Sequence, residues 1–382
     1  MTTLQSILDD AVAAGHAPGM IAAAITPSGE TLTAAAGVRA VGSSQVMTPD
    51  TVCWIASCTK AITSVAAMQL VERGLIDLDA PVGRHLPLLA APQILVGFDA
   101  ADKPITRPAT TPITLRHLLT HTSGLAYGFF SADLTRYLSV TGQTMPVAAA
   151  PDIPLLFEPG TGWQYGIGTD WVGQLVEAIS GQGLDAYVAA NILAPLGMSD
   201  TGFFPPGGQS HRRAALHTRR EGGGFDLASF PIPTTPYPAM GGGGLYSTVG
   251  DYLTFLTAIM GGGQAPGGAR ILKPETVAMM GANHTGDLEA GNLTSALSYL
   301  TLDFSPLPGV AKRFGLGFLR NEAAVPGGRS AGSLAWAGLA NCYYWADPAS
   351  GVAGVLFSQL FPFADTKVLE TFAAVEQSVY AA

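Results

Sequence analysis

The sequence predicts an α/β (α+β) fold in which one antiparallel sheet is built from both ends of the chain and is flanked by helices. Strand-like runs gather near the two termini of the 382-residue chain, and segments with helical periodicity fill its middle. Strands far apart in sequence can pair in one sheet when the connection between them forms its own unit. We therefore expect a discontinuous sheet domain of residues 1–77 and 300–382, with an inserted, mostly helical domain with long loops at 78–299.

The N-terminal part is expected to contain a helix, a hairpin and a second helix. The first helix covers about residues 3–14, and two strand-like runs, 20–26 and 31–38, flank the turn sequence Pro-Ser-Gly-Glu. Apolar residues then repeat at helical spacing over 57–73, and Gly74 follows as a stop signal. This last segment is predicted to be a strongly amphipathic helix.

The middle of the chain is expected to consist of short helices divided by loops rich in proline and glycine. The clearest helical segments are residues 115–119, 169–179, 251–260 and 274–280. A long loop region with little periodicity is expected between residues 205 and 244.

Strand character returns near the C-terminus, where runs rich in aromatic and β-branched residues follow one another. These predicted strands cover residues 314–319, 334–345 and 352–359. A final helix is predicted over about residues 366–380, and no internal repeat is visible.

The composition argues against two classes of partner. Charged residues make up only 12% of the chain, which is about half of the usual share, and the net charge is −9. Only five residues are lysine, and no basic run could follow a phosphate backbone, so no nucleic-acid partner is expected. No apolar run approaches the roughly 18 residues that cross a bilayer, so no membrane partner is expected.

The cysteines and the N-terminal residues indicate the compartment. Cys53, Cys58 and Cys342 are odd in number and lack the spacing of metal ligands, which is typical of reduced thiols. The first residues lack the positive and apolar regions of a signal peptide. We therefore expect a cytoplasmic protein, and nothing in the sequence indicates its oligomeric state.

Ser57 and Lys60 form a Ser-x-x-Lys tetrad that can carry chemistry. Residues three apart share one face of a helix, so the hydroxyl and the amine would point the same way. The N–H groups at a helix N-terminus can stabilise an oxyanion, and an apolar helix after Lys60 favours its neutral, basic form. The alternative is a capping serine beside a surface lysine, and the tetrad alone does not separate the two.

Two aromatic residues stand in similarly suggestive places. Tyr165 lies in a glycine-rich loop directly before an apolar helix, and a nearby lysine would make its phenol a candidate general base. Trp336 begins a predicted strand, and the small residues after it would let a substrate approach backbone N–H donors. The alternative for each is an aromatic side chain packed in the core.

Two further patterns do not support a site. Gly328-x-Ser330-x-Gly332 matches the nucleophile elbow of α/β-hydrolases, but every histidine of the chain precedes Ser330, so the required order of serine, acid and histidine fails. His117 and His121 have the spacing of a zinc pair without the glutamate or a third ligand, so histidines at a helix end are expected. No metal site is predicted.

The motifs S-x-x-K, Y-x-x and W-x-G occur here in an order that resembles the serine β-lactamase-like superfamily, and within it the family VIII carboxylesterases, which are esterases similar to class C β-lactamases. The resemblance covers nearly the whole chain. Its supporting segments are residues 71–87, 113–125, 158–173, 194–203 and 241–255. Residues 97–130 and the YGIGTDW run are also similar to the fungal acyltransferases that attach the side chain of statins.

The resemblance implies roles for individual residues and no metal or organic cofactor. It makes Ser57 the nucleophile, Lys60 its proton partner and Tyr165 the general base. The backbone N–H groups of Ser57 and Leu339 would form the oxyanion hole, and Trp336 would stand where β-lactamases carry the lysine of K-T-G. Whether Lys60 or Tyr165 takes the first proton stays open.

Two departures from the β-lactamase pattern bear on the substrate. The second motif lacks the asparagine that binds the β-lactam amide, and the third lacks the lysine that would meet the antibiotic carboxylate. An uncharged, aromatic substrate pocket follows from these changes. The residues expected to form it are Trp336, Gly338, Tyr127, Phe129, Phe130, Trp163 and Phe361.

The sequence therefore predicts a serine carboxylesterase that hydrolyses short- to medium-chain acyl esters through an acyl-enzyme on Ser57, with a small-molecule ester as its partner. The first alternative is an acyltransferase that passes the acyl group to an alcohol or amine. The sequence also leaves open a β-lactamase or D-amino-acid peptidase, and a binding protein that has lost turnover.

Overall fold

A seven-stranded antiparallel sheet combines strands from both ends of the chain. The computed structural model describes residues 3–143, 153–204, 210–230 and 239–382. The order across the sheet is β2-β1-β13-β12-β11-β10-β9. Its members are β1 (Gly19–Ile25), β2 (Thr31–Gly37), β9 (Lys312–Phe314), β10 (Leu319–Asn321), β11 (Leu334–Gly338), β12 (Cys342–Asp347) and β13 (Val352–Phe357). The pairing of β1 with β13 joins the strands from the two ends of the chain, which confirms the predicted fold class.

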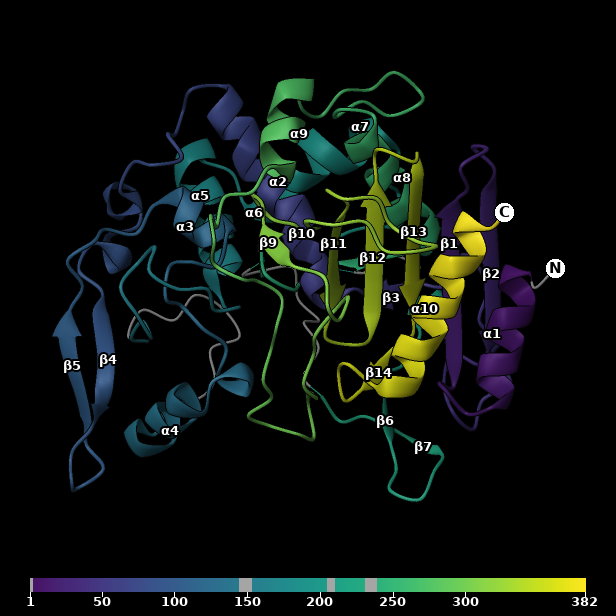
Figure 1. The fold of residues 1–382 in the computed structure, drawn as a ribbon, viewed down its shortest axis with the longest axis horizontal. Helices are drawn as coiled ribbons and strands as arrows, with labels where there is room; N and C mark the ends of the chain where they lie inside the picture. The colour runs from purple at the N-terminus through teal and green to yellow at the C-terminus, as the bar shows by residue number, and fades with distance from the viewer. Residues whose placement is uncertain (1–2, 144–152, 205–209, 231–238) are drawn as a thin grey trace.

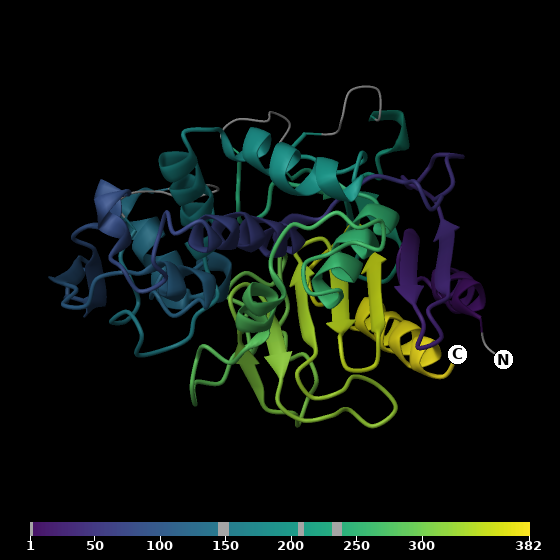
Figure 2. The same ribbon diagram turned by 90° about the horizontal axis from the view of Figure 1, so that it is seen from above.

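Helices cover both faces of this sheet. Helices α1 (Leu4–Ala13) and α10 (Thr366–Tyr380) pack together on one face, and α8 (Val249–Met260) packs against the other (Figures 1 and 2). Every residue of β12 and β13 is buried, as a strand covered on both faces requires.

The chain between β2 and β9 supplies the remaining helices and, apart from β14, the strands of three small sheets. The helices are α2 (Thr59–Glu72), α3 (Leu115–Leu119), α4 (Ala132–Thr141), α5 (Gly168–Ser180), α6 (Leu184–Val188), α7 (Ala194–Leu196) and α9 (Pro274–Gly281). The small sheets pair β3 (Cys53–Trp54) with β8 (Tyr246–Ser247), β4 (Gln93–Phe98) with β5 (Pro104–Pro108), and β6 (His217–Arg219) with β7 (Phe225–Leu227) and β14 (Leu360–Phe361). The division into two domains stays a prediction.

Three predicted elements differ from the structure. The helix expected over 57–73 begins at Thr59, after the 3-10 turn η1 (Ala56–Cys58), and residues 59–70 are buried on all sides rather than on one. The strand expected over 334–345 is the hairpin β11–β12, which turns at Asn341 with φ 53°. The run 314–319 is likewise divided between β9 and β10. In each case packing against a neighbouring element, which periodicity does not report, decides the outcome.

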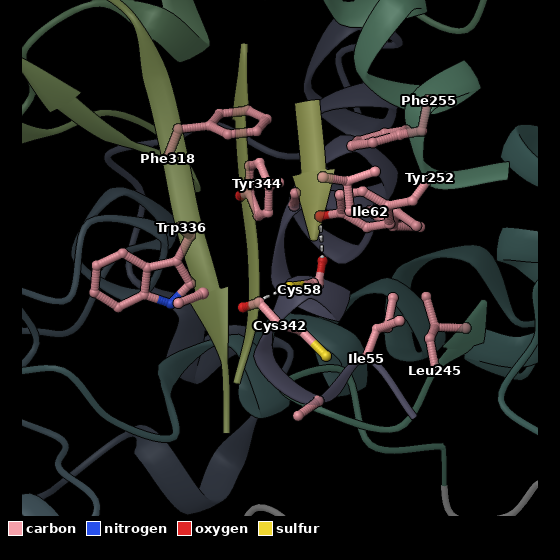
Figure 3. Close-up of a cluster of buried hydrophobic side chains, with 14 of the residues drawn as sticks. Ile55, Cys58, Ile62, Leu245, Tyr252, Phe255, Phe318, Trp336, Cys342 and Tyr344 are labelled. Carbon is pink, nitrogen blue, oxygen red and sulfur yellow. Dashed lines mark hydrogen bonds between the residues drawn. The ribbon is translucent and has the colours of Figure 1, made fainter. Parts of the chain in front are cut away.

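The start of α2 is held by a buried cluster on the face of the sheet opposite α1 and α10. Figure 3 shows Cys58 and Ile62 facing Tyr252 of α8 and Tyr344 of β12. The Tyr252 hydroxyl donates a hydrogen bond of 2.8 Å to the Cys58 carbonyl oxygen, and the Cys58 thiol contacts the Cys342 carbonyl oxygen at 3.8 Å. This packing fixes η1 in place.

Among the described residues, no helix is both long and apolar enough to cross a membrane. Within the same ranges, no group of three or more potential ligand side chains could hold a metal ion.

Candidate active site

Ser57 lies in η1, at the entrance to the buried helix α2. The residue before it, Ala56, has φ 45°, a left-handed conformation that is rare for a residue with a side chain and is often found at functional sites. The Trp54 indole fixes this strained entry by donating to the Gly243 carbonyl oxygen at 2.7 Å. Ser57 is half-buried whereas its neighbours on both sides are buried, because its side chain opens into a cavity.

Lys60 lies in the first turn of α2, directly after η1, and is only 2% exposed. Its Nζ lies 3.3 Å from Ser57 Oγ, as the predicted i, i+3 relation requires. The same amine donates to the Gly242 carbonyl oxygen at 2.6 Å and to the Tyr127 hydroxyl at 3.0 Å. The structure thus brings the serine and the lysine together and gives the lysine two further partners.

A buried carboxylate, Asp170 of α5, stands behind those two partners. It accepts a hydrogen bond of 2.9 Å from the Gly242 N–H on Oδ1 and one of 3.3 Å from the Tyr127 hydroxyl on Oδ2. Burial raises the pKa of Asp170 above its ordinary value, and the positive charge of Lys60 opposes this effect. No residue of this second layer was identified from the sequence as a partner of Lys60.

Tyr165 lines the same cavity, but its hydroxyl does not reach Lys60. Its ring lies 4.8 Å from that of Trp336 and 4.9 Å from Lys60 Nζ, measured to the ring centroids. The side chain is 3% exposed, and no described residue forms a hydrogen bond with its hydroxyl. The hydroxyl that forms a hydrogen bond with Lys60 is therefore that of Tyr127, which was predicted only as part of the pocket wall.

The end of β11 lies against the strained turn before Ser57. A Cβ added to Gly338 would come within 2.3 Å of the Ile55 carbonyl oxygen, so only glycine allows this approach. Leu339, the next residue, lines the cavity together with Ser57. The two backbone N–H groups of the predicted oxyanion hole thus belong to segments that converge at one cavity.

The cavity has a volume of about 390 Å³, and the described residues that line it include no lysine, arginine, histidine, aspartate or glutamate. Its lining residues are Trp54, Ala56, Ser57, Tyr127, Phe129, Phe130, Tyr165, Phe230, Met240, Gly242, Gly243, Leu293, Tyr299, Leu300, Trp336, Ala337, Leu339 and Phe363. Of the residues predicted for the substrate pocket, Tyr127, Phe129, Phe130 and Trp336 line this cavity. Further lining residues that were not identified from the sequence include Phe230, Leu293, Tyr299, Leu300 and Phe363.

Three residues predicted for the pocket lie behind its wall. Trp163 packs 6.5 Å from Trp336 and 5.9 Å from Phe314, measured between ring centroids, and does not line the cavity. Phe361 packs 5.1 Å from Phe230, measured between ring centroids, and Phe230 rather than Phe361 lines the cavity. Gly338 is covered by the Ile55 carbonyl. Aromatic character in sequence did not reveal which ring faces the cavity and which supports it.

The patterns set aside in the sequence have structural roles. His117 forms a capping box with Thr114 at the start of α3. Its backbone N–H donates to Thr114 Oγ1 at 3.2 Å, and its ring Nδ1 accepts a hydrogen bond from the Thr114 N–H. His121 lies among aromatic rings, 4.8 Å from Tyr165, and burial lowers its pKa well below the ordinary value, so it stays neutral. Ser330 donates its N–H to Asp347 in a turn outside the cavity.

Comparison with known proteins gives independent findings. A profile of the family described as Beta-lactamase matches residues 4–377. The chain is 33% identical over 351 residues to the monacolin J acid methylbutanoyltransferase of Aspergillus terreus, a match that covers 87% of this chain and 82% of that protein. It is 31% identical over 377 residues to the lovastatin esterase of Penicillium rubens, with 93% and 90% covered.

A solved structure agrees with these matches. The LovD6 mutant of simvastatin synthase from Aspergillus terreus superposes with a TM-score of 0.86 at 31% identity, covering 99% of this chain and 94% of that one. The resemblance indicated by the motifs is therefore confirmed. One of the two curated relatives is named as an acyltransferase and the other as an esterase.

Proposed function

Because the chain belongs to the β-lactamase family, we propose that it is a serine carboxylesterase that hydrolyses short- to medium-chain acyl esters. The observation that carries the proposal is the pair of Ser57 and Lys60, with 3.3 Å between Oγ and Nζ, at the base of an apolar cavity. A hydroxyl beside an amine supplies an activated nucleophile, and the apolar wall receives an uncharged acyl chain.

The reaction proceeds in two steps through an ester on Ser57. Ser57 Oγ attacks the carbonyl carbon and loses its proton, and the negative oxygen of the tetrahedral intermediate accepts hydrogen bonds from the N–H groups of Ser57 and Leu339. Each such donor contributes about 3–4 kcal/mol to the stability of the transition state. The leaving alcohol regains a proton, and water then attacks the acyl-enzyme by the same route in reverse.

Tyr165 fits a role at the leaving oxygen and at the deacylating water. Tyr165 lines the cavity, and its buried hydroxyl has no hydrogen-bond partner among the described residues, so its capacity to bind an oxygen of the substrate or a water is unused. A positioned acid or base of this kind contributes about 10²–10⁴-fold to a rate.

The cavity supports uncharged esters as the substrate class. A carboxylate that entered it would lose its hydration without gaining a cationic partner from the described lining residues. Anionic β-lactams are therefore disfavoured, as the absence of the asparagine and lysine of the β-lactamase motifs also suggests. A small-molecule ester is the proposed partner.

Acyl transfer to an alcohol is the second candidate, and the comparisons give a specific reason for it. A relative named as a methylbutanoyltransferase and another named as an esterase match the chain at 33% and 31% identity. Both reactions share the acyl-enzyme and differ only in whether an alcohol or water attacks it. Product ratios measured with and without an added alcohol separate the two candidates.

We also propose a cytoplasmic location. Its support is that Cys53, Cys58 and Cys342 are all free and buried, which is typical of proteins kept in a reducing compartment.

The nucleophile is tested by intact-protein mass spectrometry with p-nitrophenyl butyrate, for the wild type beside Ser57→Ala. We expect a burst of nitrophenol and an acyl mass increment in the wild type, and neither in the variant. Equal turnover in both proteins would contradict the assignment of Ser57.

A further inference from the structure

The three partners of the Lys60 amine define where its remaining electron pair points. Nζ lies 2.6 Å from the Gly242 carbonyl oxygen, 3.0 Å from the Tyr127 hydroxyl and 3.3 Å from Ser57 Oγ. A tetrahedral amine nitrogen has three directions besides the bond to its own carbon, and Lys60 has three such partners. A carbonyl oxygen can only accept, so one N–H of Lys60 is committed to Gly242.

The Tyr127 hydroxyl has a defined direction for its own proton. Its oxygen lies near Asp170 Oδ2 as well as near Lys60 Nζ, at 3.3 and 3.0 Å. Burial raises the pKa of Tyr127 well above its ordinary value, and the charge of Asp170 adds to this, so the phenol keeps its proton. Because a carboxylate can only accept, Tyr127 donates to Asp170 and accepts from Lys60.

Asp170 therefore holds both of the partners that Lys60 has besides Ser57. Its Oδ1 accepts the N–H of Gly242, whose carbonyl oxygen binds Lys60. A Cβ on Gly242 would lie 2.3 Å from Asp170 Oδ2, so glycine is required for this close approach. The carboxylate is 5% exposed, and the charge of Lys60 and the hydrogen bonds from Gly242 and Tyr127 compensate it for the loss of water.

We propose that Asp170 is a positioning residue. It acts through Tyr127 and Gly242, which orient the Lys60 amine so that its electron pair points toward Ser57 Oγ. The inference rests on the proposed function and deepens it, since it makes Lys60 the group that takes the first proton. When Lys60 acts as the base, two of its N–H bonds are committed to these partners and its electron pair faces the Ser57 hydroxyl.

The acylation step follows from this geometry. The O–H bond of Ser57 breaks, its proton joins Lys60 Nζ, and the electron pair left on Oγ forms the bond to the ester carbonyl carbon. The π electrons of the carbonyl move to its oxygen, and the proton later leaves with the alcohol. If Asp170 did not accept the Tyr127 proton, that proton would face Lys60 and compete with Ser57 for the electron pair.

The test compares acylation rate constants of Asp170→Asn, Tyr127→Phe and the double variant in a stopped-flow burst with p-nitrophenyl butyrate. Asparagine keeps a carbonyl oxygen for the Gly242 N–H, but its amide group opposite Tyr127 is a donor and turns the phenol proton toward Lys60. The burst amplitude counts folded active sites, so the rate constant is independent of any loss of folded protein.

Asp251→Asn is the matched control. Asp251 also accepts one backbone N–H, from Asp200 at 2.8 Å, and one hydroxyl, from Thr201 at 2.8 Å. It does not line the cavity, so the same change of carboxylate to amide is made away from the site.

We expect Asp170→Asn to slow acylation about 100-fold and Tyr127→Phe to slow it about 10-fold, within the range for a positioned base. The double variant should stay within about threefold of Tyr127→Phe, because asparagine then has no phenol to turn, and the control should change less than about twofold. Two results would overturn the proposal. One is an acylation rate constant of Asp170→Asn within about threefold of the wild type, and the other is a loss of rate in the double variant that equals the product of the losses in the two single variants.

The pH profile of acylation separates orientation from a simple effect of charge. The titratable groups that face Lys60 are Cys58, His121, Tyr127, Tyr165 and Asp170. Loss of orientation lowers the plateau of the profile, whereas loss of charge alone would move the profile along the pH axis with its plateau unchanged, and that result would also overturn the proposal. A burst that survives in the serine variant would instead refute the proposed function.

Discussion

Gly338→Ala tests the proposed oxyanion hole through a single added methyl group. The new Cβ would lie 2.3 Å from the Ile55 carbonyl oxygen and 3.2 Å from Cys342 Cβ. Because ordinary contacts begin at about 3.5 Å, the end of β11 must move by about 1 Å. The amide of Leu339 moves with it, and loss of one oxyanion donor costs about 3–4 kcal/mol, or 10²–10³-fold in kcat.

The assay is steady-state hydrolysis of p-nitrophenyl butyrate, with kcat and KM determined separately and active sites counted by titration. We expect kcat to fall about 100-fold and KM to change less than about threefold, because the apolar wall that binds the acyl chain is untouched. Gly250→Ala is the control: a Cβ there meets nothing within 4 Å, and alanine favours its helix α8. A wild-type kcat in Gly338→Ala, or a fall that only matches the loss of active sites, would refute the reasoning.

Three further predictions concern charge. A p-nitrophenyl ester of succinic acid, with a free carboxylate, should show a kcat/KM at least about 100-fold below that of the butyrate ester, and equal values would contradict the uncharged pocket. Glu376→Ala should lower the free energy of unfolding by about 3–5 kcal/mol in urea titrations, because it leaves Arg329 buried and unpaired. The N–H of Thr111 and the guanidinium of Arg107 lower the pKa of Glu158 to about 2. Its stabilising effect is therefore present above pH about 4.5 and lost as the pH falls toward 2, so the stability curve of Glu158→Gln should meet that of the wild type at the acid end.

Local spacing made the chemical core of the site predictable. Ser57 and Lys60 are three residues apart, and helical geometry alone brings their side chains together. The turn at Asn341 also has a local signal, since asparagine tolerates the left-handed conformation that is found there. A single strand was nevertheless predicted over 334–345, because aromatic and β-branched residues continue on both sides of the turn.

Long-range packing explains the features that the sequence did not give. The helix α2 was expected to have one solvated face, but α5 and α6 pack against it and cover sides that periodicity alone would leave open. Trp163 and Trp336 look equivalent in sequence, and only the assembled fold places one behind the other. Tyr127 is 67 residues from Lys60, so no pattern in the chain could have paired their polar atoms.

The arrangement of charge around Lys60 accounts for an apolar cavity that nevertheless supports polar chemistry. Lys60 and Asp170 are both nearly fully buried, and neither lines the cavity, whereas Tyr127 and Gly242 do. Tyr127 and Gly242 also link Lys60 to Asp170 by hydrogen bonds. Once Lys60 has taken the Ser57 proton, its charge and that of Asp170 stabilise each other behind the wall, while the substrate meets aromatic rings and the Ser57 hydroxyl. A substrate carboxylate would find no such compensation, so the residues proposed to activate Ser57 also account for the proposed preference for uncharged esters.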